Sequence, residues 1–168
     1  PAFTVVAAGS NPNTCGVNNG SATAIITQGV GPFGFIWNTG ANTQTISNLA
    51  AGTYSVVLIA TNDINCADSV TQQVVVNPMP STAYSINTAA QCLTGNSFSF
   101  TNSSAIASGT LTHLWSFGDG GTATTLNATK TYSSAGTYSV KLVSTSNNGC
   151  KDSTTRQVTV HPMPIAGF

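Results

Sequence analysis

The feature that most constrains the fold of this chain is an internal repeat in which equivalent residues are 84 positions apart. Three blocks recur at this shift: Ala51–Val56 as Ala135–Val140, Cys66–Ser69 as Cys150–Ser153, and Asn77–Pro80 as His161–Pro164. Similarity at a fixed period is typical of repeated structural units. The sequence therefore predicts two tandem domains, 1–78 and 79–163. Residues 164–168 are expected to begin a third unit of a longer array.

Within each predicted domain, apolar and polar residues alternate over short stretches that end in turn residues. Tyr138, Val140 and Leu142 share one face of an extended backbone, for example, and Ser139 and Lys141 share the other. A helical period is found nowhere in the chain. The pattern predicts an all-β fold of two β-sandwiches. The prolines of the segment 77–80 fix φ and remove hydrogen-bond donors, which predicts a short, stiff linker.

Three blocks of the second domain occur in a familiar order. They are Trp115-Ser116-Phe117-Gly118-Asp119-Gly120, Lys130-Thr131-Tyr132 and Gly136-Thr137-Tyr138-Ser139-Val140. This series resembles the signature of PKD domains, over roughly Pro80 to Pro162. Ser116 stands where the family usually carries Asp, and His113 where an aromatic residue is more common. The resemblance implies an extracellular immunoglobulin-like β-sandwich.

The first domain carries a related pattern without the Gly-Asp-Gly turn. Its blocks are Asn19–Ala24, Pro32-Phe33, Trp37, Asn48-Leu49 and Gly52–Val56. Together they resemble the SprB-type repeat of gliding-motility and surface adhesins of Bacteroidetes, over about Thr14 to Pro78. The resemblance implies a secreted bacterial cell-surface protein that is exported by the type IX secretion system.

Charged residues make up only 5% of the chain, and Glu is absent. Proteins that bind nucleic acid neutralise phosphates with Lys and Arg, and four scattered basic residues are too few for that. An anionic membrane surface is an equally poor partner, and the longest apolar run, Val56 to Ala60, is too short to insert into a bilayer. A surface covered by hydroxyl and amide groups is instead expected on an extracellular protein.

The four cysteines are divided equally between the two predicted domains. We interpret them as two intradomain disulfides, Cys15–Cys66 and Cys92–Cys150, which would stabilise domains this small. Reduced, buried cysteines are the alternative. A zinc site is a poorer interpretation, because the chain contains no Cys-x-x-Cys motif and its two histidines lie far apart in the sequence.

Asp119 lies between glycines and has three interpretations. The favoured interpretation is a turn aspartate that accepts hydrogen bonds from backbone N–H groups. The second is a calcium ligand, although one carboxylate is too few for a calcium site. The third is a catalytic acid. His113 is interpreted as a hydrogen-bonded core residue, His161 as part of a linker, and Lys130 as part of a solvated turn. No catalytic triad can be assembled from the sequence. The chain is therefore expected to be no enzyme and to hold no cofactor.

Asp68-Ser69-Val70 and Asp152-Ser153-Thr154 resemble the sequon that Bacteroidetes use for O-glycosylation of exported proteins. The resemblance implies sugars on Ser69 and Ser153. The alternative is that these Asp and Ser residues cap a hairpin.

Five aromatic residues are expected to point into the cores: Trp37, Tyr54, Trp115, Phe117 and Tyr138. Each tryptophan lies on the apolar face of a predicted strand, which is typical of the buried indole of a sandwich. The alternative for both tryptophans is an exposed platform on which a sugar ring stacks.

The sequence thus favours structural stalk repeats of a large secreted adhesin or filament, which project a distal binding region from the cell. Their expected partners are neighbouring repeats, with glycans or other surface protein chains as further candidates. Two alternatives stay open. One is a carbohydrate-binding accessory module of a polysaccharide-degrading enzyme. The other is a filament subunit that assembles by pairing sheet edges, which few charges protect.

Overall fold

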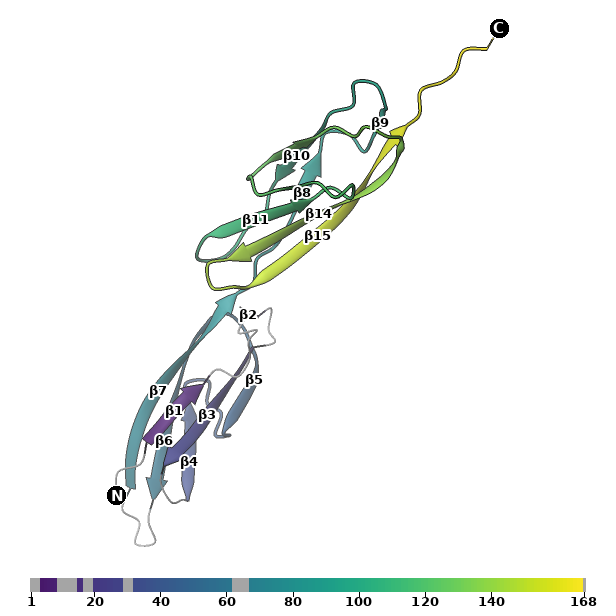
Figure 1. The fold of residues 1–168 in the computed structure, drawn as a ribbon. Helices are drawn as coiled ribbons and strands as arrows, with labels where there is room; N and C mark the ends of the chain where they lie inside the picture. The colour runs from purple at the N-terminus through teal and green to yellow at the C-terminus, as the bar shows by residue number, and fades with distance from the viewer. Residues whose placement is uncertain (1–3, 9–14, 17–19, 29–31, 62–66, 168) are drawn as a thin grey trace. The chain divides into compact units, whose positions relative to one another are not determined.

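The computed structural model describes the chain except for residues 1–3, 9–14, 17–19, 29–31, 62–66 and 168 (Figure 1). The chain divides into two compact units, Pro1–Met79 and Pro80–Phe168, here called unit 1 and unit 2. Every regular element among the described residues is a β-strand, which confirms the all-β prediction. The described part of the chain contains no helix that could cross a membrane.

Unit 1 is built from two sheets. One has the strand order β1-β3-β5 and the other β2-β7-β6-β4. The strands are β1 (Thr4–Ala8), β2 (Cys15–Gly16), β3 (Gly20–Gln28), β4 (Phe33–Trp37), β5 (Thr45–Leu49), β6 (Gly52–Thr61) and β7 (Ala67–Pro78). Both sheets contribute side chains to one core, in which Ala22 and Ala24 of β3 join Trp37 of β4 and Val56 of β6. The arrangement is a β-sandwich.

Unit 2 repeats this plan around a more aromatic core. Its sheets have the orders β13-β10-β8 and β12-β11-β14-β15-β9. The strands are β8 (Tyr84–Ile86), β9 (Ala90–Cys92), β10 (Phe98–Asn102), β11 (Leu111–Ser116), β12 (Thr122–Ala123), β13 (Ala128–Lys130), β14 (Gly136–Ser146) and β15 (Lys151–His161). Tyr84 and Phe100 come from the first sheet and pack against Trp115 of the second, with ring centroids 5.0 and 5.7 Å from the indole.

The internal repeat of the sequence reappears in the strand pairing. Antiparallel β6 and β7 pair from Gly52↔Val76 onward, and β14 and β15 pair from the equivalent Gly136↔Val160. A short strand then adds in parallel to the end of each hairpin: β2 to β7, with Cys15 opposite Asn77, and β9 to β15, with Cys92 opposite His161. Both units therefore have the same framework.

Side-chain hydrogen bonds repeat as well. The hydroxyls of Tyr54 and Tyr138 donate to the carbonyls four residues earlier, at 3.0 and 2.8 Å. The indole N–H groups of Trp37 and Trp115 donate to the carbonyls of loop residues, at 2.8 and 3.0 Å. Buried Tyr and Trp need such partners for their polar ends. Hydrogen bonds of the same kind thus fix loops in both units, and those of the tyrosines come from a shared sequence block.

Candidate functional site

The Gly-Asp-Gly turn after β11 is the most distinctive loop of unit 2. Gly118 and Gly120 have φ of 82° and 90°, in the left-handed region that suits glycine. A Cβ at Gly118 would lie 2.8 Å from the backbone nitrogen of Ser139, so only glycine fits there. The Asp119 carboxylate accepts the N–H of Gly121 at 3.0 Å, as the turn interpretation predicts.

Lys130 contacts this turn from β13, and the solvated-turn interpretation of Lys130 was wrong. Its ammonium group lies 2.6 Å from an Asp119 oxygen and about equally far, 5.5 and 5.6 Å, from the ring centroids of Phe117 and Tyr132. Partial desolvation raises the pKa of Asp119, but hydrogen bonds from Lys130 and Gly121 and the lysine charge outweigh it, so the pKa is lowered overall. The turn is held by an ion pair over aromatic rings.

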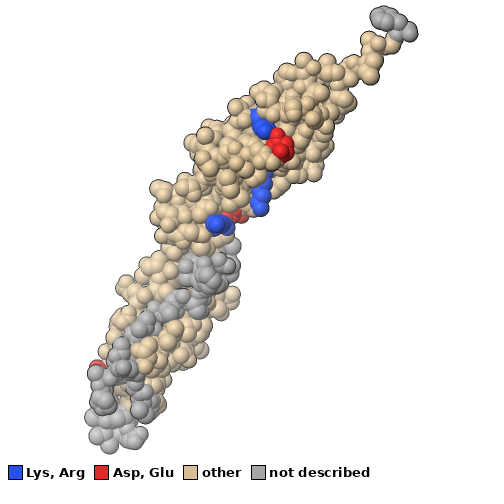
Figure 2. All heavy atoms as spheres, in the orientation of Figure 1, with Lys and Arg blue, Asp and Glu red and all other residues tan. Residues whose placement is uncertain are grey.

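This ion pair bears on the calcium interpretation of Asp119. The carboxylate is occupied by a lysine of its own unit, and the described residues contain no group of three or more His, Cys, Asp or Glu side chains that could bind a metal ion. Charges are sparse elsewhere too, and Figure 2 shows them as small spots on a face that is otherwise uncharged. The ion pair thus gives Asp119 a structural role in unit 2.

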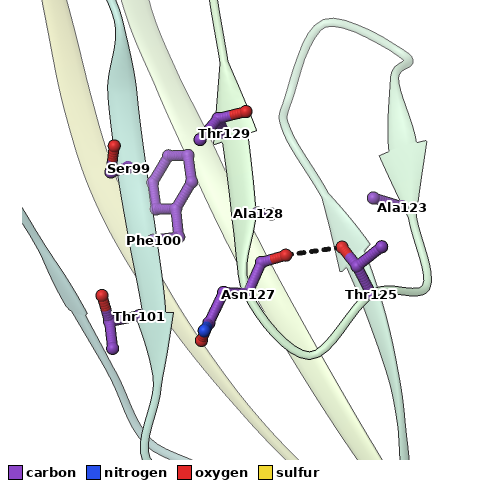
Figure 3. Close-up of a pocket in the computed structure, with 8 residues that line it drawn as sticks. All are labelled: Ser99, Phe100, Thr101, Ala123, Thr125, Asn127, Ala128 and Thr129. Carbon is purple, nitrogen blue, oxygen red and sulfur yellow. Dashed lines mark hydrogen bonds between the residues drawn. The ribbon is translucent and has the colours of Figure 1, made fainter.

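A shallow groove of about 380 Å³ lies beside the strand pair β10 and β13 (Figure 3). Its lining is Ser99, Phe100, Thr101, Ala123, Thr125, Asn127, Ala128 and Thr129. The Thr125 hydroxyl donates to the Asn127 carbonyl at 2.6 Å, and the Asn127 amide oxygen accepts the N–H of Asn102 at 2.9 Å. The groove thus offers hydroxyl and amide groups to a neutral polar ligand, and no charged group.

The groove lacks an aromatic platform. Phe100 is only 1% exposed, because its ring belongs to the core. Trp37 and Trp115 are 2% and 0% exposed, so neither indole is available for stacking on a sugar. Tyr54 and Tyr138 are half-buried, and Phe117 is buried. In the described part of the chain, the large apolar side chains that are exposed are all aliphatic.

The two histidines lie apart from one another in unit 2. His113 is half-buried on β11, where its Nδ1 lies 3.2 Å from the Ser144 hydroxyl; that hydroxyl donates to Ser104 at 3.0 Å. Burial lowers the pKa of His113. His161 ends β15 and is exposed. His113 thus begins a hydrogen-bonded chain that passes through Ser144 of β14 to Ser104, in the loop after β10.

The glycosylation candidates Ser69 and Ser153 are exposed on β7 and β15. Asp68 accepts the N–H of Ser69 at 2.8 Å, and Asp152 accepts the N–H of Thr82 at 2.7 Å. Both serines are therefore accessible to a transferase, and their modification stays a prediction.

The predicted Cys92–Cys150 disulfide is wrong. Cys92 is a free, exposed thiol, whereas Cys150 is fully buried and disulfide-bonded. Cys92 lies opposite His161, the last residue of β15, and Cys150 directly precedes Lys151, the first. Ten residues of strand separate these ends by roughly 33 Å, whereas a disulfide needs Cα atoms within about 7 Å.

Cys15 is disulfide-bonded, and its predicted partner Cys66 lies outside the described residues. Cys15 is opposite Asn77, near the end of β7, while Ala67 begins that strand. The Cys15–Cys66 pairing stays a prediction.

Sequence reasoning missed Asn96, which is 3% exposed. Its amide donates to the carbonyls of Leu93 and Tyr132 at 2.7 and 2.9 Å and accepts the N–H of Tyr132 at 2.7 Å. No local pattern marks an Asn whose main partner is so distant in the sequence.

Residues 76–161, just over half of the chain, match the model of the PKD domain. The chain belongs to the PKD domain family. Domains of this family are extracellular and typically non-catalytic modules, and the disulfide-bonded cysteines fit a secreted protein. The match to the SprB-type repeat in unit 1 stays an expectation.

Solved structures of PKD domains are similar to half of this chain. The PKD1 domain of Vibrio anguillarum Epp is 30% identical; the match covers 52% of this chain and 99% of that one, with a TM-score of 0.46. The PKD1 domain of the Vibrio cholerae metalloprotease PrtV is also 30% identical; that match covers 49% of this chain and 98% of the other, with a TM-score of 0.44. A structure from work on carbohydrate-binding modules of the β-sandwich superfamily is 30% identical. The match covers 51% of this chain and 36% of that one, with a TM-score of 0.48. No curated protein matches the sequence.

Proposed function

We propose that this PKD-containing chain is a spacer: a pair of structural repeats, from the stalk of a secreted cell-surface adhesin, that holds a binding region away from the cell. The observation that carries the proposal is the repetition of a self-supporting module. Each unit has its own buried core. The tyrosine and tryptophan hydrogen bonds that fix its loops recur in the other unit, those of the tyrosines at equivalent positions of the sequence repeat.

The surface supports a spacer role as well. A stalk needs a soluble, inert exterior, and this exterior is wetted by hydroxyl and amide groups with few charges. Attraction to charged partners over long range is therefore weak. Bacterial origin, gliding and type IX export are part of the proposal only through the SprB-type resemblance of unit 1.

The groove beside β10 and β13 favours one second candidate, a carbohydrate-binding accessory module. Its hydroxyl and amide lining suits a neutral sugar. The buried state of Phe100 and both tryptophans counts against it, because sugar recognition draws strongly on stacking. The spacer proposal is therefore preferred.

Stretching the protein by its ends tests the spacer proposal. Under reducing conditions, single-molecule force spectroscopy should give two separate unfolding events, each releasing roughly 25 nm of chain. One event, or gradual extension without peaks, would contradict two self-supporting repeats.

Glycan binding separates the candidates. A spacer leaves a panel of immobilised neutral glycans unbound. Saturable binding that is lost in Asn127→Ala and kept in Thr88→Ala, an exposed residue outside the groove lining, would instead establish the accessory module. Concentration-dependent oligomers of the reduced protein in analytical ultracentrifugation would favour the filament subunit.

A further inference from the structure

The thiol of Cys92 is the most unusual reactive group on unit 2. Secreted proteins seldom keep an exposed free thiol, and an unpaired cysteine in such a protein suggests a bond to a cysteine elsewhere. Cys92 is exposed and free. Its predicted partner, Cys150, is bonded to another sulfur and lies at the opposite end of β15.

The equivalent cysteine of unit 1 is bonded. Cys15 occupies the same position in the framework as Cys92: each is on the short strand that adds in parallel to the last strand of its unit, opposite Asn77 or His161. Asn77 and His161 are themselves equivalent positions of the sequence repeat. Cys15 is disulfide-bonded. The position is therefore one that forms disulfides in this fold.

The two cysteine positions of unit 2 mark its two ends. The chain enters the unit beside Cys150, because the N–H of Thr82 donates to Asp152 at 2.7 Å and Asp152 is two residues from Cys150. The chain leaves the unit beside Cys92, because β15 ends at His161, opposite Cys92. Cys150 is thus an entry cysteine and Cys92 an exit cysteine.

Unit 2 holds the exit cysteine in a fixed position. The Gln91 side chain donates to the Ser97 carbonyl at 2.9 Å and accepts its N–H at 2.7 Å. The N–H of Leu93 donates to His161 at 2.9 Å. Residues on both sides of Cys92 are therefore anchored, and little conformational freedom is lost when its sulfur forms a bond.

We propose that Cys92 forms a disulfide with the entry cysteine of the repeat that follows it in an array. The inference rests on the proposed function, since it needs a following repeat. A repeat attached after His161 starts beside Cys92, which raises the effective concentration of its entry cysteine. Unit 2 is then joined covalently to the repeat that follows it, in place of the Cys92–Cys150 bond that the sequence predicts.

The chemistry is thiol–disulfide exchange with a disulfide oxidant such as oxidised glutathione. The Cys92 thiolate attacks one sulfur of the oxidant, forming a mixed disulfide and releasing one glutathione thiolate. The entry cysteine thiolate attacks the Cys92 sulfur of that mixed disulfide and releases the second. Two electrons pass from the cysteines to the oxidant, and the two glutathione thiolates take up the two thiol protons.

The test compares this chain with an extended chain in which a second copy of residues 81–168 follows Pro164, the equivalent of Pro80. The added copy carries Cys92→Ser, so that it contributes no second Cys92 peptide, and Asn148→Gln, a substitution at an exposed residue that marks its Cys150 peptide by mass. Both are equilibrated with reduced and oxidised glutathione, alkylated, and digested without reduction. In the original chain, mass spectrometry should find the Cys92 peptide alkylated. In the extended chain that alkylation should be lost, and the Cys92 peptide should be joined to the added copy of the Cys150 peptide.

Two variants of the extended chain serve as controls. Cys92→Ser should leave the added entry cysteine open to alkylation. The second variant combines Cys92→Ser with Ser97→Cys, which moves the thiol to another exposed position. This thiol should be found alkylated. The proposal is overturned if Cys92 remains alkylated in the extended chain, carries only glutathione, or joins its own Cys150. Two force peaks in the reduced protein would still support the spacer role after such a failure.

Discussion

Asn96 is a buried amide that ties the loop before β10 to Tyr132. Asn96→Ala should lower the free energy of unfolding of unit 2 by about 2–4 kcal/mol, because it leaves a buried N–H and carbonyl of Tyr132 without partners. Urea denaturation followed by tryptophan fluorescence measures this change. Asn127→Ala is the matched control: it removes one hydrogen bond at an exposed residue and should cost about 1 kcal/mol or less. Equal effects of the two variants would contradict this role.

The Asp119–Lys130 pair predicts a defined pH dependence. The pKa of Asp119 is lowered in the folded protein, so the pair stabilises unit 2 above the unfolded pKa of about 4, and this is lost as the pH falls through the folded pKa. Because both side chains are partly exposed, the contribution at pH 7 is at most about 1 kcal/mol. Asp119→Asn should remove it.

The contribution of this ion pair to stability is measured from the urea midpoints of the wild-type protein and Asp119→Asn between pH 7 and pH 2. The difference between the two proteins should be present at neutral pH and vanish in acid. A difference that is constant with pH would mean that the turn geometry, and not the charge, provides the stabilisation.

Single residues were predicted unevenly from the sequence. The inward tryptophans and the turn role of Asp119 follow from local pattern, since alternation fixes a face and flanking glycines fix a turn. The contact of Lys130 with Phe117 and Asp119 does not, because it joins β13 to a loop well before it in the sequence through packing. The bidentate role of Asn96 is equally non-local.

At the scale of elements, the turn after β11 and the hairpin of β14 and β15 meet at Gly118. Gly118→Ala would place a Cβ 2.8 and 2.9 Å from backbone atoms of Ser139. We expect a loss of roughly 3 kcal/mol or more, because a left-handed φ is combined with a backbone clash. Urea denaturation of unit 2 measures the loss.

Gly120 provides the matched comparison for Gly118. It also has a left-handed φ, but an added Cβ meets no atom within 4 Å. Gly120→Ala should therefore cost only about 1 kcal/mol. If the two variants were equally unstable, close approach to β14 would not be the reason for glycine at position 118.

The strands of the two units were predicted correctly from alternation, but the Cys92–Cys150 pairing was not. Spacing along the sequence places one cysteine before and one after the central strands, which suggests a bond within each domain. The parallel addition of β9 to the far end of β15 separates the pair by the length of the strand. That pairing involves only three residues on β9, too few to leave a sequence signal.

At the scale of the whole molecule, the separate cores predict independent stability. Leu58 and Leu142 occupy equivalent positions of the sequence repeat, and both are fully buried. Leu58→Ala should destabilise unit 1 by about 2–5 kcal/mol and leave unit 2 unchanged, and Leu142→Ala should do the reverse. Hydrogen exchange of the reduced protein, read by mass spectrometry for peptides of each unit, measures both.

Independence fails if either leucine substitution raises exchange equally in both units. The units would then unfold as one cooperative body, and the two force peaks expected for a spacer would merge.

The parallel pairing of β9 with β15 determines how tension acts on unit 2. Pulling on the chain at its entry draws β9 one way, and pulling at its exit draws β15 the opposite way. Because the strands run in the same direction, they must slide past each other lengthwise, in shear. The flanking hydrogen bonds, Thr159 to Ala89 at 2.8 Å and Leu93 to His161 at 2.9 Å, are then strained together and cannot open in sequence like a zipper. With only a few pairs of residues, this patch can thus act as a mechanical clamp.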